Sequence, residues 1–365
     1  MKCLVQPDDG VLPVIKAINS ARKSIDIVIF RFSQAQIEKA LTTAVSRGVH
    51  VHALIANTNR GGEKNLRELE MRLLAAGVTV ARTDDELVRY HGKMMIVDNK
   101  TLYVLGFNFT SLDMERSRSF GIVTSNQKQV TEAAKLFQCD TQRLPYSSGV
   151  ASLVVSPVNA RKQLATFIRG AKKQLFIYDP ETSDPEMVRL LEARARAGVD
   201  IRIIGKPARN PSALPEARIL QIRLHTRTIV RDGTWAFVGS QSLRTLELDA
   251  RREVGIIFRD PKCVARILKT FQSDWESKAE ALAQGLGENE PVEAAGASAA
   301  RVAKKVAKAV AGNLGPVTPV VEMTFRELSG LHAEVELDRD QIEETVRDAV
   351  KDAVKQAVRE MMDPA

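Results

Sequence analysis

The chain has 365 residues, of which 44% are hydrophobic and 27% are charged. A chain of this length and composition can bury two cores and still carry an appendage. Its three cysteines, Cys3, Cys139 and Cys263, are too few and too scattered to predict a disulfide framework or a zinc site. No apolar stretch is long enough to cross a bilayer, and the N-terminus turns polar at Gln6, which together predict a cytoplasmic protein.

Charge is distributed unevenly along the chain. Residues 281–365 hold 10 Lys and Arg and 15 Asp and Glu, so the first 280 residues hold the remaining 43 and 30, a balance of +13 against −5. A basic body favours polyanionic partners, either an anionic membrane surface met peripherally or nucleic acid. A solvated basic surface without any partner is the alternative.

The first 280 residues repeat one order of predicted elements. Each copy has a helix, an apolar strand, a second helix that stops at a glycine, and another strand. Residues 21–30 resemble residues 171–178, and residues 37–55 resemble residues 187–205, in both cases at a separation of 150. Helices that alternate with short strands predict an α/β fold, and the internal repeat predicts two duplicated lobes.

A histidine-centred pattern follows these elements once in each lobe, just before a short apolar run. The residues of the first copy are His91, Lys93, Asp98 and Asn108, and those of the second are His225, Arg227, Asp232 and Ser242. A second apolar run follows each motif strand, at residues 102–105 and 235–238, and is expected to pair with it. We therefore expect a mixed sheet in each lobe, flanked by helices.

The chemistry of the motif can be predicted from its spacing. Side chains alternate across a strand, so His91 and Lys93 point to the same face. An imidazole beside a fixed cation suits an anionic substrate, because the cation holds the anion while the imidazole attacks or shuttles a proton. His225 and Arg227 repeat this arrangement, and phosphate is the expected anion.

The pattern H-x-K-x4-D, followed by a glycine-containing turn and an asparagine, is similar to the HKD signature of the phospholipase D superfamily. The resemblance covers most of residues 1–280 and includes both copies of the motif. It implies two pseudo-symmetric lobes with the active site in the cleft between them, and neither a metal nor another cofactor.

The resemblance also implies a mechanism and a role for each residue. A phosphodiester is cleaved through a covalent phosphohistidine, which water or an alcohol then resolves. His91 is expected to be the nucleophile and His225 the general acid, while Asp98 and Asp232 orient and balance the motif cations. The residues expected to hold the phosphate oxygens are Lys93, Asn108, Arg227 and Ser242.

The second copy of the motif departs from the family pattern. Arg227 replaces lysine and Ser242 replaces asparagine, which changes the donor geometry and shortens the reach. Glu253, eleven residues after Ser242, occupies the position where the family commonly places a glutamate that orients a catalytic imidazole, whereas the first lobe has Ser119 there. The sequence leaves open which imidazole Glu253 orients, and whether the lobes have specialised or the second site has decayed.

Four segments are predicted: lobe 1 at residues 1–145, lobe 2 at 146–280, a linker with a short basic helix at 281–337, and an amphipathic helix at 338–365. The last helix is expected to self-associate or to dock on the body. The preferred function is hydrolysis or phosphatidyl transfer at a phospholipid phosphodiester. A nuclease of the same superfamily and a non-catalytic phosphate-binding module are the alternatives.

Overall fold

The computed structural model describes residues 1–57, 63–84, 86–207 and 217–283. The chain divides into one unit of Met1–Gln284 and a second of Gly285–Ala365, and the second lies outside the described residues. The predicted basic helix within residues 281–337 and the amphipathic helix at 338–365 therefore also lie outside them. The last described helix, α9 (Pro261–Ala283), continues into residues 281–283, which corrects the expected start of the linker.

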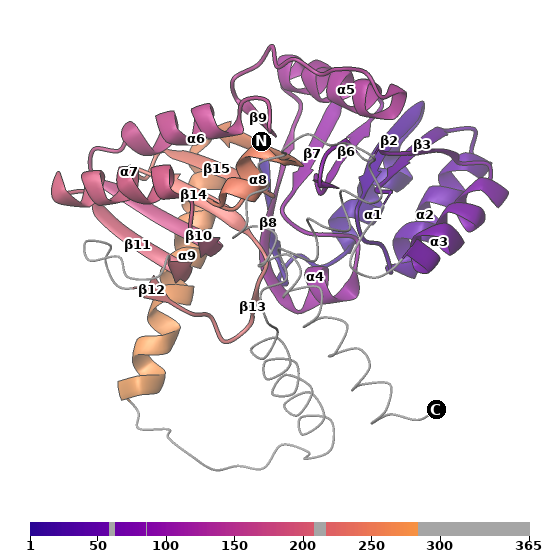
Figure 1. Cartoon of the computed structure of the whole chain (residues 1–365). Helices are drawn as coiled ribbons and strands as arrows, with labels where there is room; N and C mark the ends of the chain where they lie inside the picture. The colour runs from indigo at the N-terminus through magenta and orange to yellow at the C-terminus, as the bar shows by residue number, and fades with distance from the viewer. Residues whose placement is uncertain (58–62, 85, 208–216, 284–365) are drawn as a thin grey trace, which may run out of the picture. The chain divides into compact units, whose positions relative to one another are not determined.

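Lobe 1 contains a mixed sheet with helices on both faces (Figure 1). Its strands follow the order β1-β8-β7-β6-β2-β3-β4. Their bounds are β1 (Lys2–Gln6), β2 (Ser24–Ile29), β3 (His50–Ile55), β4 (Thr79–Arg82), β6 (Met94–Val97), β7 (Thr101–Leu105) and β8 (Ser117–Thr124). Strands β2, β3 and β4 are parallel, and β6 to β8 and β1 pair antiparallel, as predicted for a mixed sheet.

Helices α1 (Leu12–Ser20), α2 (Ala35–Ser46) and α3 (Glu63–Ala75) pack on one face of this sheet. Their buried side chains, such as Ile18, Leu41 and Leu69, contact the alternate strand residues that point to the same side. Helix α5 (Gln127–Gln142) covers the opposite face, where Leu136 and its neighbours join a second core.

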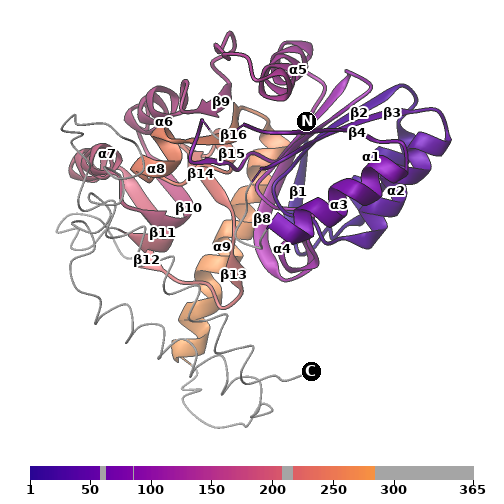
Figure 2. The ribbon, with the colours of Figure 1, turned by 45° about the vertical axis from the view of Figure 1, so that its right-hand side comes forward.

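Lobe 2 repeats the arrangement in the order β12-β11-β10-β14-β15-β16, with β9 pairing with β16. The bounds are β9 (Leu153–Ser156), β10 (Gln174–Thr182), β11 (Asp200–Pro207), β12 (Ala217–Arg218), β14 (Arg227–Arg231), β15 (Trp235–Gly239) and β16 (Arg251–Phe258). Helices α6 (Ala160–Arg169) and α7 (Pro185–Arg196) cover one face, and α9 covers the other (Figure 2). The predicted duplication of an α/β lobe is confirmed.

One hydrophobic core is shared by the two lobes. It combines buried residues of lobe 1, such as Ile96 and Phe120, with Val230 and Val254 of lobe 2 and Phe271 of α9. Burial of each such side chain stabilises the fold by roughly 1.5–3 kcal/mol. The two lobes are therefore joined by a continuous apolar interior rather than by a hinge.

Two short strands cross between the lobes. Strand β5 (Arg89–Tyr90) pairs in parallel with β16 of lobe 2, with Arg89 opposite Arg251. Strand β13 (Arg223–Leu224) pairs in parallel with β8 of lobe 1, with Arg223 opposite Ser117. Each crossing strand ends directly before a motif histidine, so each histidine is placed by the sheet of the other lobe.

Candidate active site at the seam between the lobes

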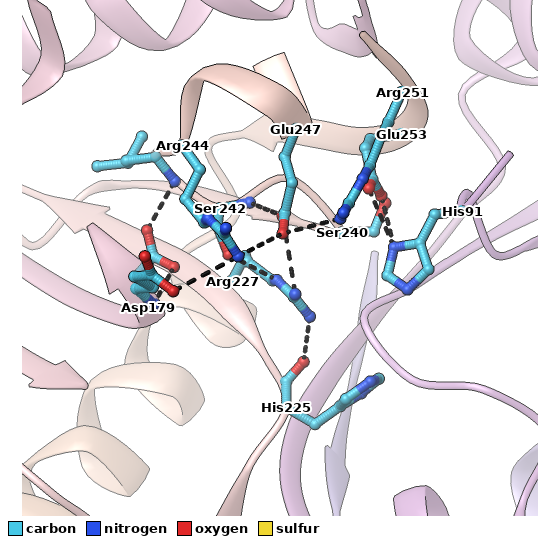
Figure 3. Close-up of polar contacts among 12 residues, drawn as sticks. His91, Asp179, His225, Arg227, Ser240, Ser242, Arg244, Glu247, Arg251 and Glu253 are labelled. Atoms are coloured by element: carbon cyan, nitrogen blue, oxygen red, sulfur yellow. Dashed lines mark hydrogen bonds and ion pairs between the residues drawn. The ribbon is translucent and has the colours of Figure 1, made fainter. Parts of the chain in front are cut away.

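The two motif histidines are anchored through their backbones to opposite lobes. The amide of His91 donates to the carbonyl of Arg252 at 2.7 Å, and the amide of His225 donates to the carbonyl of Arg118 at 3.1 Å. Both side chains are nearly buried, with 8% of His91 and 7% of His225 exposed. Figure 3 shows the two imidazoles at the seam, reached from different elements. The predicted meeting of the two motifs therefore has a structural cause, the reciprocal strand exchange.

Glu253 holds the imidazole of His91. The Nδ1 atom lies 2.8 and 3.0 Å from the two carboxylate oxygens of Glu253, which is fully buried on β16 (Figure 3). Because an ionised carboxylate only accepts hydrogen bonds, Nδ1 carries the proton and Nε2 keeps its lone pair. Lys93 Nζ donates to this Nε2 at 2.8 Å and to the His91 carbonyl at 2.6 Å. The ring of Phe30 packs edge-on, with centroids 4.5 Å apart.

A different carboxylate faces His225. Its Nδ1 lies 3.5 Å from Oδ2 of Asp113, in the short helix α4 (Ser111–Glu115) of lobe 1. The same oxygen accepts from the amide and the Nδ2 of Asn108 at 2.9 and 2.6 Å, and Arg223 binds the other oxygen. Ser119, the counterpart of Glu253, is buried, and its hydroxyl has no hydrogen-bond partner among the described residues. Each histidine thus faces a carboxylate of the opposite lobe, but from a different position in the repeat.

Arg227 reaches the seam from β14. Its Nε donates to the Ser242 hydroxyl at 3.0 Å, and Nη1 donates to the His225 carbonyl at 3.1 Å. Glu247, in the short helix α8 (Thr245–Asp249), lies 3.7 Å from Nη2 and accepts from the Ser242 amide at 2.7 Å (Figure 3). The serine therefore holds the arginine side chain instead of extending toward the histidines.

The cationic groups and burial keep both imidazoles neutral. Burial lowers the pKa of His91 well below its usual value, and Lys93 and Arg227 lower it further. Burial also lowers the pKa of His225 strongly, although Asp113 acts against this shift. Burial lowers the pKa of Lys93 to about 7, opposed by Glu253. Because Lys93 and Arg227 act on both imidazoles, the two rings share one electrostatic environment.

Asp98 and Asp232 lie away from this environment. The carboxylate of Asp98 accepts from the amides of Arg22, Lys23 and Ser24 at 2.7 to 3.1 Å. Asp232 binds the amides of Lys172, Lys173 and Gln174 in the same way. A four-residue strand such as β6 spans about 13 Å, and the aspartate follows it whereas the histidine precedes it. The expectation that these aspartates orient the motif cations is therefore corrected, because they fix the starts of β2 and β10.

Three buried carboxylates were missed by the sequence analysis. Asp113 and Glu247 stand five residues after Asn108 and Ser242, so an acidic residue at the same place in both copies was an available signal. The third, Asp179, ends the regular part of β10 and accepts from the Leu243 amide at 2.7 Å. Burial raises its pKa to about 7.

Within the described ranges, no group of His, Cys, Asp and Glu side chains could hold a metal ion. The helices of the described part of the chain also include none long and apolar enough to cross a membrane.

Comparison with known proteins identifies the family. The model of the family described as "Cardiolipin synthase, PLD-like domain" matches residues 14–141 and 164–275, one stretch in each lobe. The chain therefore belongs to this phospholipase D-like family, and the resemblance inferred from the two motifs is confirmed.

Three individual proteins illustrate the relationship. Cardiolipin synthase 1 of Bacillus cereus is 21% identical over 76% of this chain and 67% of its own length. Mitochondrial cardiolipin hydrolase of Mus musculus is 26% identical over 39% of this chain and 60% of its own. The crystal structure of polyphosphate kinase from Porphyromonas gingivalis superposes with a TM-score of 0.62 at 18% identity, over 75% of this chain and 50% of that one, which shows the fold alone. The chain thus spans about two thirds or less of each relative.

Proposed function

We propose that this chain is a phospholipase D-type phosphodiesterase that cleaves phospholipids, by hydrolysis or by phosphatidyl transfer. The observation that carries the proposal is the bond between His91 Nδ1 and Glu253, which leaves Nε2 of a neutral imidazole available beside two cations. The names of the relatives, a cardiolipin synthase and a cardiolipin hydrolase, favour a phospholipid as the substrate.

In the first step, Nε2 of His91 attacks phosphorus. The N–P bond forms while the P–O bond to the leaving group breaks, and the leaving oxygen takes a proton from His225. Lys93, which contacts Nε2 in the free site, moves its hydrogen bond to a phosphate oxygen. Together with Arg227 it stabilises the charge that develops in the transition state.

In the second step, water or an alcohol attacks phosphorus as His225 takes its proton. The new P–O bond forms and the N–P bond breaks, which restores neutral His91. Water gives hydrolysis, and a lipid alcohol gives phosphatidyl transfer.

The role of His225 as an acid depends on the bound substrate. Its pKa is lowered by burial and by nearby cations in the free site, so it is neutral there. A phosphodiester anion placed between Lys93 and Arg227 offsets those cations and favours the imidazolium. Asp113, 3.5 Å from Nδ1, adds a second negative charge on the opposite side of the ring. Protonation of the acid is thus coupled to binding of the anion.

Asn108 and Ser242 support this machinery differently. Asn108 donates to Asp113 and so fixes the carboxylate that faces His225, while Ser242 accepts from Arg227. Both residues act on the phosphate through a charged neighbour in the free site. Lobe 1 supplies the nucleophile and lobe 2 the acid, so the sequence differences reflect specialisation rather than decay.

The test gives purified protein phosphatidylcholine, phosphatidylglycerol and single-stranded DNA in parallel. His91→Ala is compared with His50→Ala, a matched change at an exposed histidine on β3. We expect lipid cleavage that His91→Ala abolishes and His50→Ala preserves. Cleavage of DNA alone with the same sensitivity would identify a nuclease, which the basic charge of the first 280 residues also fits. Anion binding without turnover would identify a binding module.

A further inference from the structure

The sequence before each histidine is also repeated. Residues 88–91 read Val-Arg-Tyr-His and residues 222–225 read Ile-Arg-Leu-His, with the Arg and the following apolar residue in the crossing strands β5 and β13. The first residue of each repeat is exposed, with 61% of Val88 and 39% of Ile222 accessible to solvent. Strand-type apolar side chains thus face water three residues before each buried histidine.

Each of these side chains lies beside a leucine from the short helix of the opposite lobe. The Val88 amide donates to the Ala250 carbonyl at 3.1 Å, and the Ala250 amide donates to that of Leu246 in α8 at 3.2 Å. On the other side, Arg223 is opposite Ser117, whose hydroxyl donates to the carbonyl of Leu112 in α4 at 2.7 Å.

These contacts define two seam patches: Val88 with Leu246, and Ile222 with Leu112. Leu112 is 43% exposed and Leu246 is half-buried. Single exposed apolar residues are common on protein surfaces and need no explanation. Here the same pair occurs twice, at equivalent positions of the two lobes and on both sides of the histidines. A requirement for an accessible apolar surface at the seam explains the repetition, whereas packing does not.

Basic residues accompany both seam patches. Arg89 and Arg223 directly follow Val88 and Ile222, and the exposed Arg116 lies next to Ile222 through its bond to the Leu112 carbonyl. The first 280 residues carry a net charge of +13. Apolar side chains surrounded by arginines match the boundary between acyl chains and anionic headgroups. A nucleic acid would match the arginines but would leave the apolar side chains in water.

We propose that the two seam patches dock on the surface of an anionic phospholipid bilayer, with the histidines above the headgroups between them. The inference rests on the proposed function in that it places a lipid phosphodiester at the seam. Docking on both sides of the seam would present a phosphate to His91 and His225 without removing the whole lipid from the bilayer. The burial of both imidazoles is consistent with a site that is approached from such a surface.

The experiment measures cosedimentation with phosphatidylglycerol vesicles. Val88→Thr with Ile222→Thr keeps the β-branched shape and removes apolar surface, and Met71→Thr with Leu74→Thr does the same at exposed residues of α3. We expect the seam variant to weaken binding roughly tenfold and the α3 variant to have no effect. Equal binding by both variants, or equal loss in both, would overturn the proposal. Loss of single-stranded DNA binding with unchanged vesicle binding would assign the patches to nucleic acid instead.

A second variant reports insertion directly. Tryptophan at position 88 or 222 should show a blue-shifted emission with phosphatidylglycerol vesicles and none with phosphatidylcholine vesicles, whereas Met71→Trp should show neither. Absence of the shift at both seam positions contradicts docking. Turnover of bis(p-nitrophenyl) phosphate separates the two claims: cleavage without vesicle binding refutes the docking alone, and vesicle binding without cleavage of any phosphodiester refutes the proposed function alone.

Discussion

His91 and Glu253 meet across the seam, with Nδ1 of one residue 2.8 Å from a carboxylate oxygen of the other. The glutamate lies on β16, and β5, which pairs with β16, leads directly into the histidine. The same strand exchange that joins the sheets therefore sets the tautomer of the proposed nucleophile. Neither lobe could form this pair alone.

Glu253→Gln tests that relationship. The amide fits the same volume but removes the charge that holds the Nδ1 proton and supports a positive charge on the ring during attack. We expect kcat to fall by about 100-fold or more, with a smaller change in KM. The control is Glu276→Gln, an exposed glutamate of α9, which should retain full activity. Full activity of Glu253→Gln would refute the orienting role.

Asp113→Asn tests the carboxylate that faces His225. The change removes a negative charge that raises the pKa of His225, so the acid loses its proton at a lower pH. We expect the alkaline limb of the kcat/KM profile to move to lower pH. The loss should be smaller for p-nitrophenyl esters, whose leaving group needs little protonation. Glu115→Gln, on the same short helix, is the control, and an equal loss for both classes of leaving group would contradict the assignment.

Lys93→Arg tests the source of the alkaline limit. The pKa of Lys93 is lowered to about 7, so its positive charge is lost as the pH rises through that value. Arginine keeps its proton, and Arg227 shows that the fold accommodates arginine at the equivalent place. If Lys93 sets the limit, kcat/KM of the variant should extend at least about one pH unit higher. An unchanged profile would assign the limit to His225, and Lys100→Arg serves as the control.

Asp98→Asn should affect stability and leave catalysis intact. Burial raises the pKa of Asp98, but three backbone hydrogen bonds outweigh this and lower it below its usual value. Its contribution is therefore present above the unfolded pKa and is lost as the pH falls through the folded pKa. Asparagine tolerates the left-handed conformation at φ 53°, so the change isolates the charge.

We expect Asp98→Asn to lower the free energy of unfolding by about 1 kcal/mol at pH 7, because the site is partly exposed and screened. Urea unfolding should show this difference at pH 7 and a smaller one near pH 3. A large loss of kcat with unchanged stability would instead return Asp98 to the catalytic machinery.

The duplicated lobes, the mixed sheets and the pairing of the two motifs could be predicted because they depend on local periodicity and on a repeat within the chain. The crossing strands could not, since Arg89 pairs with Arg251 far along the sequence and two-residue strands carry no periodic signal. The partner of Glu253 was left open for the same reason. The role of Asp98 was predicted wrongly because closeness in sequence to Lys93 hid the length of the strand between them.

The most direct test of the proposed mechanism is to trap the covalent intermediate. In His225→Asn, a p-nitrophenyl ester of phosphatidic acid can still react, because its leaving group departs without an acid, whereas the second step lacks its base. We predict a stoichiometric burst of p-nitrophenol and an acid-labile phosphatidyl adduct on the peptide that contains His91. An adduct on another residue, or steady turnover with no adduct and no burst, would contradict the assignment of His91 as the nucleophile.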